Sequence, residues 1–181
     1  LVTMPFENEK NARTVAIQGL EAMNKLCNTT IVVDNNRPVE AMPEVVLESV
    51  LPMADGILIN VLRGLSETVS TPNSFRTGQS DIRDVLKNGG VALAGVGESN
   101  STFRVEEAVR NALHSPFLEV DHKSANGALV FITGDSSMSN LEAARVADVV
   151  GEMLPVEASI VWGARVDPSL DSKLRVTLVL T

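Results

Sequence analysis

The chain has 181 residues, of which 44% are hydrophobic and 21% charged, a balance typical of a folded globular protein. Its net charge of −8, with 3% aromatic residues and no Tyr, argues against nucleic acid as a partner, because nucleic-acid-binding proteins present basic surfaces and stacking side chains. The single cysteine, Cys27, excludes an internal disulfide, and its apolar helical spacing predicts a buried side chain. No stretch approaches the roughly 20 apolar residues of a membrane helix, and the first residues have no signal-peptide pattern, so we expect a cytoplasmic protein without direct membrane insertion.

The first 42 residues predict a strand, a helix and a second strand. The sequence "LVTMPF" is typical of a strand ended by Pro5, "NARTVAIQGLEAMNKLC" places small and apolar residues on one helical face, and "TTIVVDNN" indicates a buried strand followed by a polar turn. At this spacing the three elements form a βαβ unit with parallel strands. Ligand contacts in such sheets lie beyond the carboxyl ends of the strands, here near residues 5–9 and 34–36.

Residues 43–72 predict one long linking helix. The side chains after Pro52 are apolar around much of the helix circumference, which is typical of a helix buried between two packed layers. A proline inside a helix removes one hydrogen bond and clashes with the preceding turn, so either the helix bends at Pro52 or its main segment begins there.

Residues 73–181 predict an α+β domain with its own sheet. A polar loop at 73–90 leads into two amphipathic helices and four strands, and Ser139 with Glu142 forms a capping-box pattern at the second helix. The whole chain therefore combines an α/β part with an α+β part: a βαβ remnant, a long central helix, and a four-stranded mixed sheet with two helices. Two strands are too few to close a doubly wound sheet by themselves.

A series of motifs, in order along nearly the whole chain, resembles the FtsZ family of the tubulin superfamily, the polymerising GTPases of prokaryotic cell division. The motifs are "VTMPFENEKNAR", "IVVDNN", "LPMADGIL", "NGGVALAGVGES", "RVEEAVRNALHSPFLE", "GALVFITG", "WGARVDP" and "LRVTLVLT". The second and seventh are closer to archaeal members. The resemblance implies that residues 1–42 end a GTP-binding domain, 43–72 form the central helix, and 73–181 form the C-terminal GTPase-activating domain. The family's phosphate loop, GGGTGTG, is absent from this sequence, so we expect a fragment of a longer protein.

The resemblance implies four nucleotide-binding residues. Glu9 and Arg13 would contact the ribose and guanosine side, while Asn35 and Asp55 would hold the guanine edge. A carboxylate suits guanine because it accepts hydrogen bonds from N1–H and the exocyclic amine together. The pattern alone also allows a solvated first helical turn at Glu9 and Arg13, a turn-forming Asn35 and a surface Asp55. Many bacterial members carry an aromatic residue four positions before the aspartate, and Leu51 at this place predicts apolar contact with the base instead of stacking.

The resemblance also implies that the 73–90 loop enters the nucleotide site of the next subunit. There an N-x-D-x-x-D pattern positions the attacking water, and it falls on Arg76, Gly78 and Asp81 in this chain. Asp81 alone keeps its acid, and it would act in trans. Loss of positioned groups commonly slows a reaction by a factor on the order of 10² to 10⁴.

The function implied is a cell-division GTPase that polymerises head to tail in the cytoplasm at the division site, with GTP or GDP at each subunit interface and Mg²⁺ beside the triphosphate. Membrane-tethering division proteins are the other expected partners. The altered loop favours the alternative, a non-catalytic or slow FtsZ-like paralogue that serves as a filament or regulatory protein. This chain alone is expected to be inactive, because its site residues address only the nucleoside end. No metal site is expected within the chain, since His114 and His122 have no convergent acids or cysteines.

Overall fold

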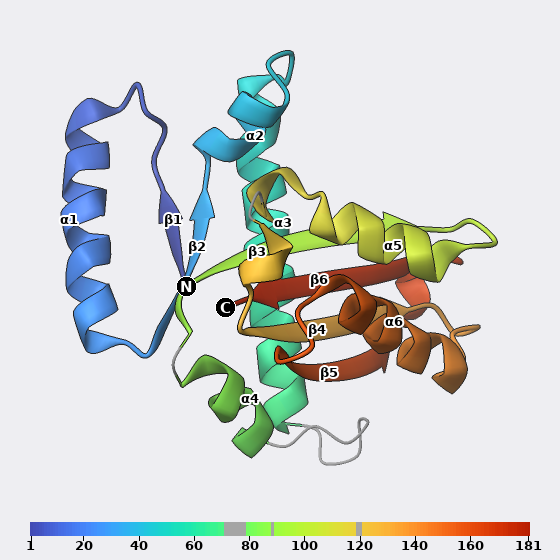
Figure 1. Cartoon of the computed structure of the whole chain (residues 1–181). Coiled ribbons are helices and arrows are strands. Elements are labelled where there is room, and N and C mark those ends of the chain that lie inside the picture. Colours follow the sequence, from blue (N-terminus) through green and yellow to red (C-terminus); the bar gives the residue numbers. More distant parts are fainter. Residues whose placement is uncertain (71–78, 88, 119–120) are drawn as a thin grey trace.

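The computed structural model describes residues 1–70, 79–87, 89–118 and 121–181. These residues form one mixed, six-stranded sheet of order β1-β2-β3-β6-β4-β5 with helices on both faces (Figure 1). The strands are β1 Val2–Met4, β2 Thr29–Asp34, β3 Gly90–Ser99, β4 Gly127–Gly134, β5 Ser159–Val166 and β6 Leu174–Leu180. The longer helices are α1 Lys10–Leu26, α3 Leu47–Ser70, α5 Arg104–Leu113 and α6 Asn140–Met153, and the shorter ones are α2 Asn36–Ala41 and α4 Gln79–Leu86.

Two apolar clusters pack against the two faces of the sheet. Helices α5 and α6 cover one face, where Val109 and Val146 are fully buried. Helices α3 and α4 cover the other, where Val61 and Ile82 are buried. Strand β4 lies between the two clusters and is buried along its whole length. The alternation of side chains along each strand feeds both clusters, which is the expected result for a sheet covered on both faces.

The predicted βαβ unit is confirmed. Strands β1 and β2 pair in parallel, with Val2 opposite Val32 and Met4 opposite Asp34, and α1 connects them. The mixed sheet of the second part is also confirmed, because β4 pairs with β5 in parallel and with β6 in antiparallel fashion.

The sheet differs from the prediction in being continuous. Strand β2 pairs in parallel with β3, from Thr29 opposite Gly90 to Val32 opposite Leu93, so the βαβ unit and the second sheet join. This pairing satisfies backbone groups along an edge of β2 that would otherwise be open. The three-part division at residues 42 and 72 stays a prediction.

The helices also show differences from the prediction. The central helix α3 begins at Leu47 and continues through Pro52. The short α2 was not predicted; its Pro38 lies in the first turn, where the missing N–H has no intrahelical partner to lose. Helix α4 falls within the stretch predicted as a loop, and it forms because Ile82 and Val85, three residues apart, both enter the core.

Cys27 is exposed, so the prediction of a buried thiol was wrong. It follows α1, a helix in which no residue is buried and Leu26 is 87% exposed. Only Ala16 and Leu20 of α1 pack against the core of the sheet. The apolar spacing thus predicted the helix correctly but not the burial of its far end.

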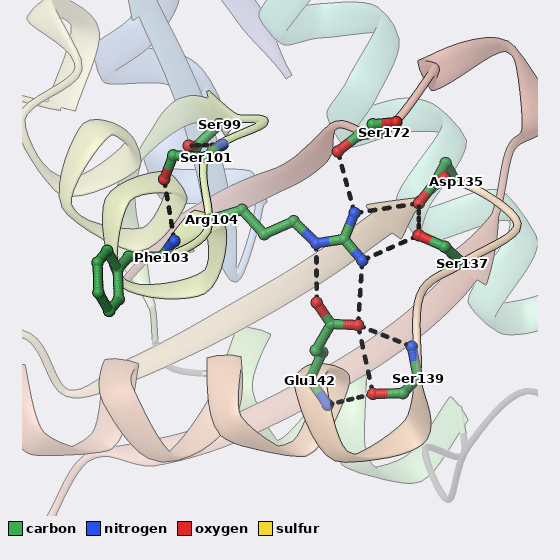
Figure 2. A network of polar contacts seen from close by, with 9 residues as sticks. All are labelled: Ser99, Ser101, Phe103, Arg104, Asp135, Ser137, Ser139, Glu142 and Ser172. Atoms are coloured by element: carbon green, nitrogen blue, oxygen red, sulfur yellow. Dashed lines mark hydrogen bonds and ion pairs between the residues drawn. The ribbon is translucent and has the colours of Figure 1, made fainter.

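A hydrogen-bond network around Arg104 joins the starts of α5 and α6 to the segments after β4 and before β6 (Figure 2). The Arg104 guanidinium donates to both carboxylate oxygens of Glu142, at 2.7 and 3.1 Å, and to Asp135 Oδ1 at 3.2 Å. It also donates to the Ser172 carbonyl oxygen at 3.0 Å. Because Ser172 has a positive φ of 66°, this contact supports a turn conformation that non-glycine residues rarely adopt. Glu142 closes the predicted capping box with Ser139.

Across the described residues, no helix combines the length and apolar content that a membrane crossing requires.

Candidate functional site

The carboxyl ends of β1 and β2 carry a compact polar cluster. Arg13, in the first turns of α1, donates from Nη1 and Nη2 to the two carboxylate oxygens of Asp34, at 2.9 and 2.8 Å. Its Nη1 also donates to the Pro5 carbonyl oxygen at 2.9 Å. The guanidinium therefore joins the end of one strand to the end of the next, and a bidentate pair of this kind fixes its orientation.

The ion pair is charged over the whole neutral range. Burial raises the pKa of the Asp34 carboxyl, but hydrogen bonds from Arg13 and Asn36 together lower it by more, so the pKa lies below its ordinary value. The hydrogen bond to Asp34 raises the pKa of Arg13. The cluster thus presents a permanent cation whose position is set by a permanent anion.

Asn36 connects the same cluster to the loop after β1. Its side-chain amide nitrogen donates to Pro5 O at 3.0 Å and to Asp34 Oδ1 at 2.8 Å, and its oxygen accepts from Glu7 N at 2.7 Å. All of its polar side-chain atoms are thus engaged within the protein. Asn36 shapes the site and has little capacity left for a ligand.

Asn35 differs from its neighbour in this respect. Its side chain is 7% exposed, and its amide oxygen is enclosed without a hydrogen-bond donor. Its backbone N–H donates to the Met4 carbonyl oxygen at 3.3 Å, which places the residue directly beside the end of β1. An enclosed acceptor without a donor costs about 1–3 kcal/mol, so such an atom calls for an explanation.

The other two predicted nucleotide residues are more exposed. Glu9 precedes α1, and its carboxylate accepts from Phe6 N at 3.1 Å. Asp55 lies exposed on α3, directly after Ala54, which is buried in the cluster that also contains Ile31 and Val33 of β2. The structure thus brings Arg13 and Asn35 together at the strand ends, while Asp55 lies on the helix packed beside β2. Among the described residues, no hydrogen bond joins Asp55 to the other three.

Asp81 lies at the other end of the molecule. It is half-buried in the first turn of α4, and Ser80 Oγ donates to its Oδ1 at 3.3 Å. Figure 1 shows α4 beyond one end of α3, and α2 with the carboxyl end of β2 near the other. Arg76 and Gly78, the two altered positions of the loop pattern, lie outside the described residues.

The separation of these two regions follows from the length of α3. A helix of 24 residues is about 36 Å long at 1.5 Å per residue. Asp55 lies in its first half, and α4, which carries Asp81, lies near its far end (Figure 1). The two carboxylates therefore cannot reach one small ligand within a single chain of this fold.

Two residues of the cluster, Asp34 and Asn36, were not singled out from the sequence. The rule for strand ends marked residues 34–36 as a group, but it did not indicate which side chains would face inward. A usable signal was present: an arginine early in the helix of a βαβ unit, together with an aspartate ending the second strand, brings opposite charges to one edge of the sheet.

A cavity of about 330 Å³ lies elsewhere, between α3 and the sheet. Its lining includes Arg63 and Glu67 of α3 with Phe131 and Arg165 of the sheet, and Arg165 Nε lies 3.0 Å from Glu67 Oε2. The lining does not include the predicted nucleotide residues. The described residues also contain no group of three or more His, Cys, Asp or Glu side chains placed to hold a metal ion.

Comparison with known proteins identifies consistent relatives. Residues 90–181 match the model of the FtsZ family, C-terminal domain. Cell division protein FtsZ 1 of Methanocaldococcus jannaschii is 37% identical over 182 residues, covering 100% of this chain and 50% of the relative. FtsZ 2 of the same organism is 34% identical over 184 residues, covering 100% of this chain and 48% of the relative.

A solved structure described as an empty FtsZ dimer from M. jannaschii superposes with a TM-score of 0.89 at 38% identity. The match covers 99% of this chain and 53% of that one. The present chain therefore spans about half the length of the relatives it matches.

Proposed function

The chain belongs to the FtsZ family, and we propose that its parent protein is a cell-division cytoskeletal GTPase that assembles head to tail with each GTPase site shared between two subunits. One observation carries the proposal: the nucleotide-binding candidates and Asp81 lie at opposite ends of α3. When identical subunits stack along this axis, the α4 end of one meets the β1-β2 end of the next. A heterologous contact of this kind repeats without closing and produces filaments.

The residues at the strand ends suit a guanine nucleotide. The enclosed oxygen of Asn35 lacks a donor, and guanine offers N–H donors at N1 and at its exocyclic amine. The Asp55 carboxylate, exposed on α3, can accept from the same edge of the base. Arg13 is held by Asp34 in a fixed orientation. Its remaining N–H groups would donate to the ribose side of the nucleotide. Adenine lacks the pair of adjacent donors that two such acceptors require.

Asp81 would serve the neighbouring subunit. A carboxylate placed beside the γ-phosphate orients the attacking water and favours the approach of its oxygen to phosphorus. Mg²⁺, bound with the triphosphate, would neutralise part of the phosphate charge. Asp81 is half-buried in the first turn of α4, at the end of the molecule that would face the next subunit in such a filament.

Self-association is supported by the relatives. The M. jannaschii FtsZ that superposes on this chain was solved as a dimer. We place the parent in the cytoplasm at the division site, with membrane-tethering division proteins as further partners, because its relatives are named cell division proteins.

A second function, a slow or non-catalytic filament paralogue, is favoured by the sequence of the loop. Arg76 and Gly78 stand where the family carries an asparagine and an aspartate, so one acid remains of the pattern. Such a protein would keep GTP-dependent assembly and lose most of its turnover.

Phosphate release from the full-length parent, measured below and above the assembly concentration, separates these functions. For the GTPase we expect release only above that concentration, a strong decrease for Asp81→Ala with filaments retained, and an increase when Arg76→Asn and Gly78→Asp are combined. Assembly without release, rescued by the double substitution, would identify the slow paralogue. Equal release from wild type and Asp81→Ala would refute the role of Asp81 in hydrolysis.

A further inference from the structure

The C-terminal end of α4 is hydrogen-bonded to side chains at the start of β2. Thr29 Oγ1 donates to the Leu86 carbonyl oxygen at 2.5 Å, and Asn28 Nδ2 donates to the Lys87 carbonyl oxygen at 3.1 Å. The last carbonyls of a helix have no intrahelical partner, so side chains that donate to them stabilise the end of the helix. Thr29 is the first residue of β2, 57 positions before Leu86, and Asn28 directly precedes the strand.

Gly89, just before β3, packs closely against the Thr29 hydroxyl. A Cβ atom at Gly89 would lie 2.4 Å from Thr29 Oγ1 and 2.9 Å from Thr181 Cγ2, so the chain can pass there only without a side chain. Gly90 N donates to the Asn28 carbonyl oxygen at 3.0 Å and continues into the β2–β3 pairing. The end of α4, the start of β3 and the start of β2 thus share one junction.

Strand β2 therefore links the two regions of this chain that are proposed to form shared sites, the nucleotide end and the α4 end. Its first residue, Thr29, holds α4, whose first turn carries Asp81. Its last residue, Asp34, binds Arg13 of α1, and Asn35 follows directly. The four residues between, Thr30 to Val33, are all buried. Ile31 and Val33 share a core cluster with Ile82 and Val85 of α4, so packing and hydrogen bonding couple the same two elements.

We propose that Asn28 and Thr29 are positioning residues for the shared GTPase site, because they fix the end of α4 and so set where Asp81 stands against the neighbouring subunit. This inference rests on the proposed function. It predicts that removing the Thr29 hydroxyl loosens α4 and lowers turnover, although Thr29 begins β2 and the predicted nucleotide residue Asn35 follows the other end of that strand. A misplacement of about 1 Å can cost on the order of 10²-fold in rate when groups must be aligned.

The first test measures amide hydrogen exchange in the 181-residue chain. Thr29→Val keeps the shape of the side chain and its strand preference but removes the hydrogen-bond donor, whereas Thr29→Ser keeps the donor. Thr14→Val is the matched control, because Thr14 Oγ1 also donates to a helix carbonyl, that of Lys10 at 2.9 Å, but in the exposed α1. We expect exchange at the end of α4 to rise about 3- to 10-fold in Thr29→Val, as for the loss of one hydrogen bond, and to stay at the wild-type rate in the other two. An unchanged rate in Thr29→Val would overturn the cap.

The second test measures phosphate release per assembled subunit in the parent. We expect Thr29→Val to lower it about 10-fold or more, Thr29→Ser to restore it, and the affinity of the unassembled parent for GTP to stay unchanged. A purely structural cap would accelerate exchange in α4 and leave release per assembled subunit unchanged, which would overturn the positioning role. An absence of hydrolysis in the wild-type parent would instead refute the proposed GTPase, whereas the exchange result would still report on the cap.

Discussion

Helices α1 and α5 face the same side of the sheet but are held in opposite ways. Five of the ten residues of α5 are buried, whereas none of the 17 residues of α1 is. Side chains such as Val15, 68% exposed, leave much of the apolar surface of α1 in solvent. Its start is held by Arg13, and its end returns directly into β2. The Arg13–Asp34 pair lies at this weakly packed helix, whereas the tightly packed α5 carries none of the predicted nucleotide residues.

The largest effect on stability is expected when a glycine is replaced by alanine beside α5, and the matched substitution is made in α1. A Cβ at Gly97 of β3 would lie 2.2 Å from both the Ala108 carbonyl oxygen and the Ala112 nitrogen of α5, whereas a Cβ at Gly19 of α1 would meet nothing within 4 Å. Gly97→Ala should therefore lower the free energy of unfolding by about 3 kcal/mol or prevent folding. Gly19→Ala should raise it by about 0.5–1 kcal/mol, because alanine restricts the unfolded chain. Urea denaturation of both variants measures these changes in the free energy of unfolding. Equal changes would contradict the difference in packing between the two helices.

A second effect concerns the polar network that reinforces the packed region. Arg104, whose side chain is 13% exposed, contacts three other segments, whereas Arg145 on α6 is 44% exposed and contacts Glu106 and Glu152. Removing Arg104 leaves two carboxylates without their cation, so Arg104→Ala should destabilise the chain by about 2 kcal/mol. Arg145→Ala should have no measurable effect, as is usual for exposed pairs. Thermal unfolding that affected the two variants equally would show that the network adds nothing to the packing.

The same network predicts a dependence on pH. Hydrogen bonding to Arg104 holds the pKa of Glu142 below its ordinary value, and hydrogen bonding to Ser137 does so for Asp135. Groups with a lowered folded pKa bind fewer protons folded than unfolded, so their stabilisation is complete above the ordinary carboxyl range, about pH 4–5, and is lost as the pH falls through the folded values. The melting temperature of the wild type should therefore fall more steeply below about pH 5 than that of Arg104→Ala. Parallel curves would contradict this assignment.

The smallest effect on stability is expected at an unsatisfied polar group in β2. The hydroxyl of Thr30 is buried without a hydrogen-bond partner, and Thr30 is 1% exposed. Thr30→Val keeps the shape and removes the unsatisfied group, so the free energy of unfolding should rise by about 1 kcal/mol. A loss of stability on denaturation would show that the hydroxyl has a partner in solution.

Local patterns could be predicted from the sequence, and contacts between distant segments could not. The capping box at Ser139 and the parallel pairing of β1 with β2 depend on neighbouring residues and were confirmed. The pairing of β2 with β3 joins residues some 60 positions apart, so no local pattern specifies it. Helix α4 has only eight residues, and its formation depends on core contacts of Ile82 and Val85 that form only when the sheet is in place.

The candidate site shows the same division. Asn35 was identified through the family resemblance, whereas its enclosed oxygen, and the engagement of Arg13 by Asp34, follow from packing at the strand ends. The capping of α4 by Thr29 was likewise invisible in the sequence, because a hydroxyl at the start of a strand has many possible partners.

The most direct test of the shared site mixes two defective subunits of the full-length parent. Asp55→Ala impairs the nucleotide end and keeps Asp81, and Asp81→Ala does the reverse, so neither should release phosphate at more than a small fraction of the wild-type rate. In an equal mixture that assembles at random, about a quarter of the interfaces join an intact nucleotide end to an intact Asp81, as expected for a heterologous contact. We predict that the mixture recovers up to about a quarter of wild-type release above the assembly concentration. A mixture that releases no more than the average of its two components would show that Asp55 and Asp81 do not act across one interface, and would contradict the account.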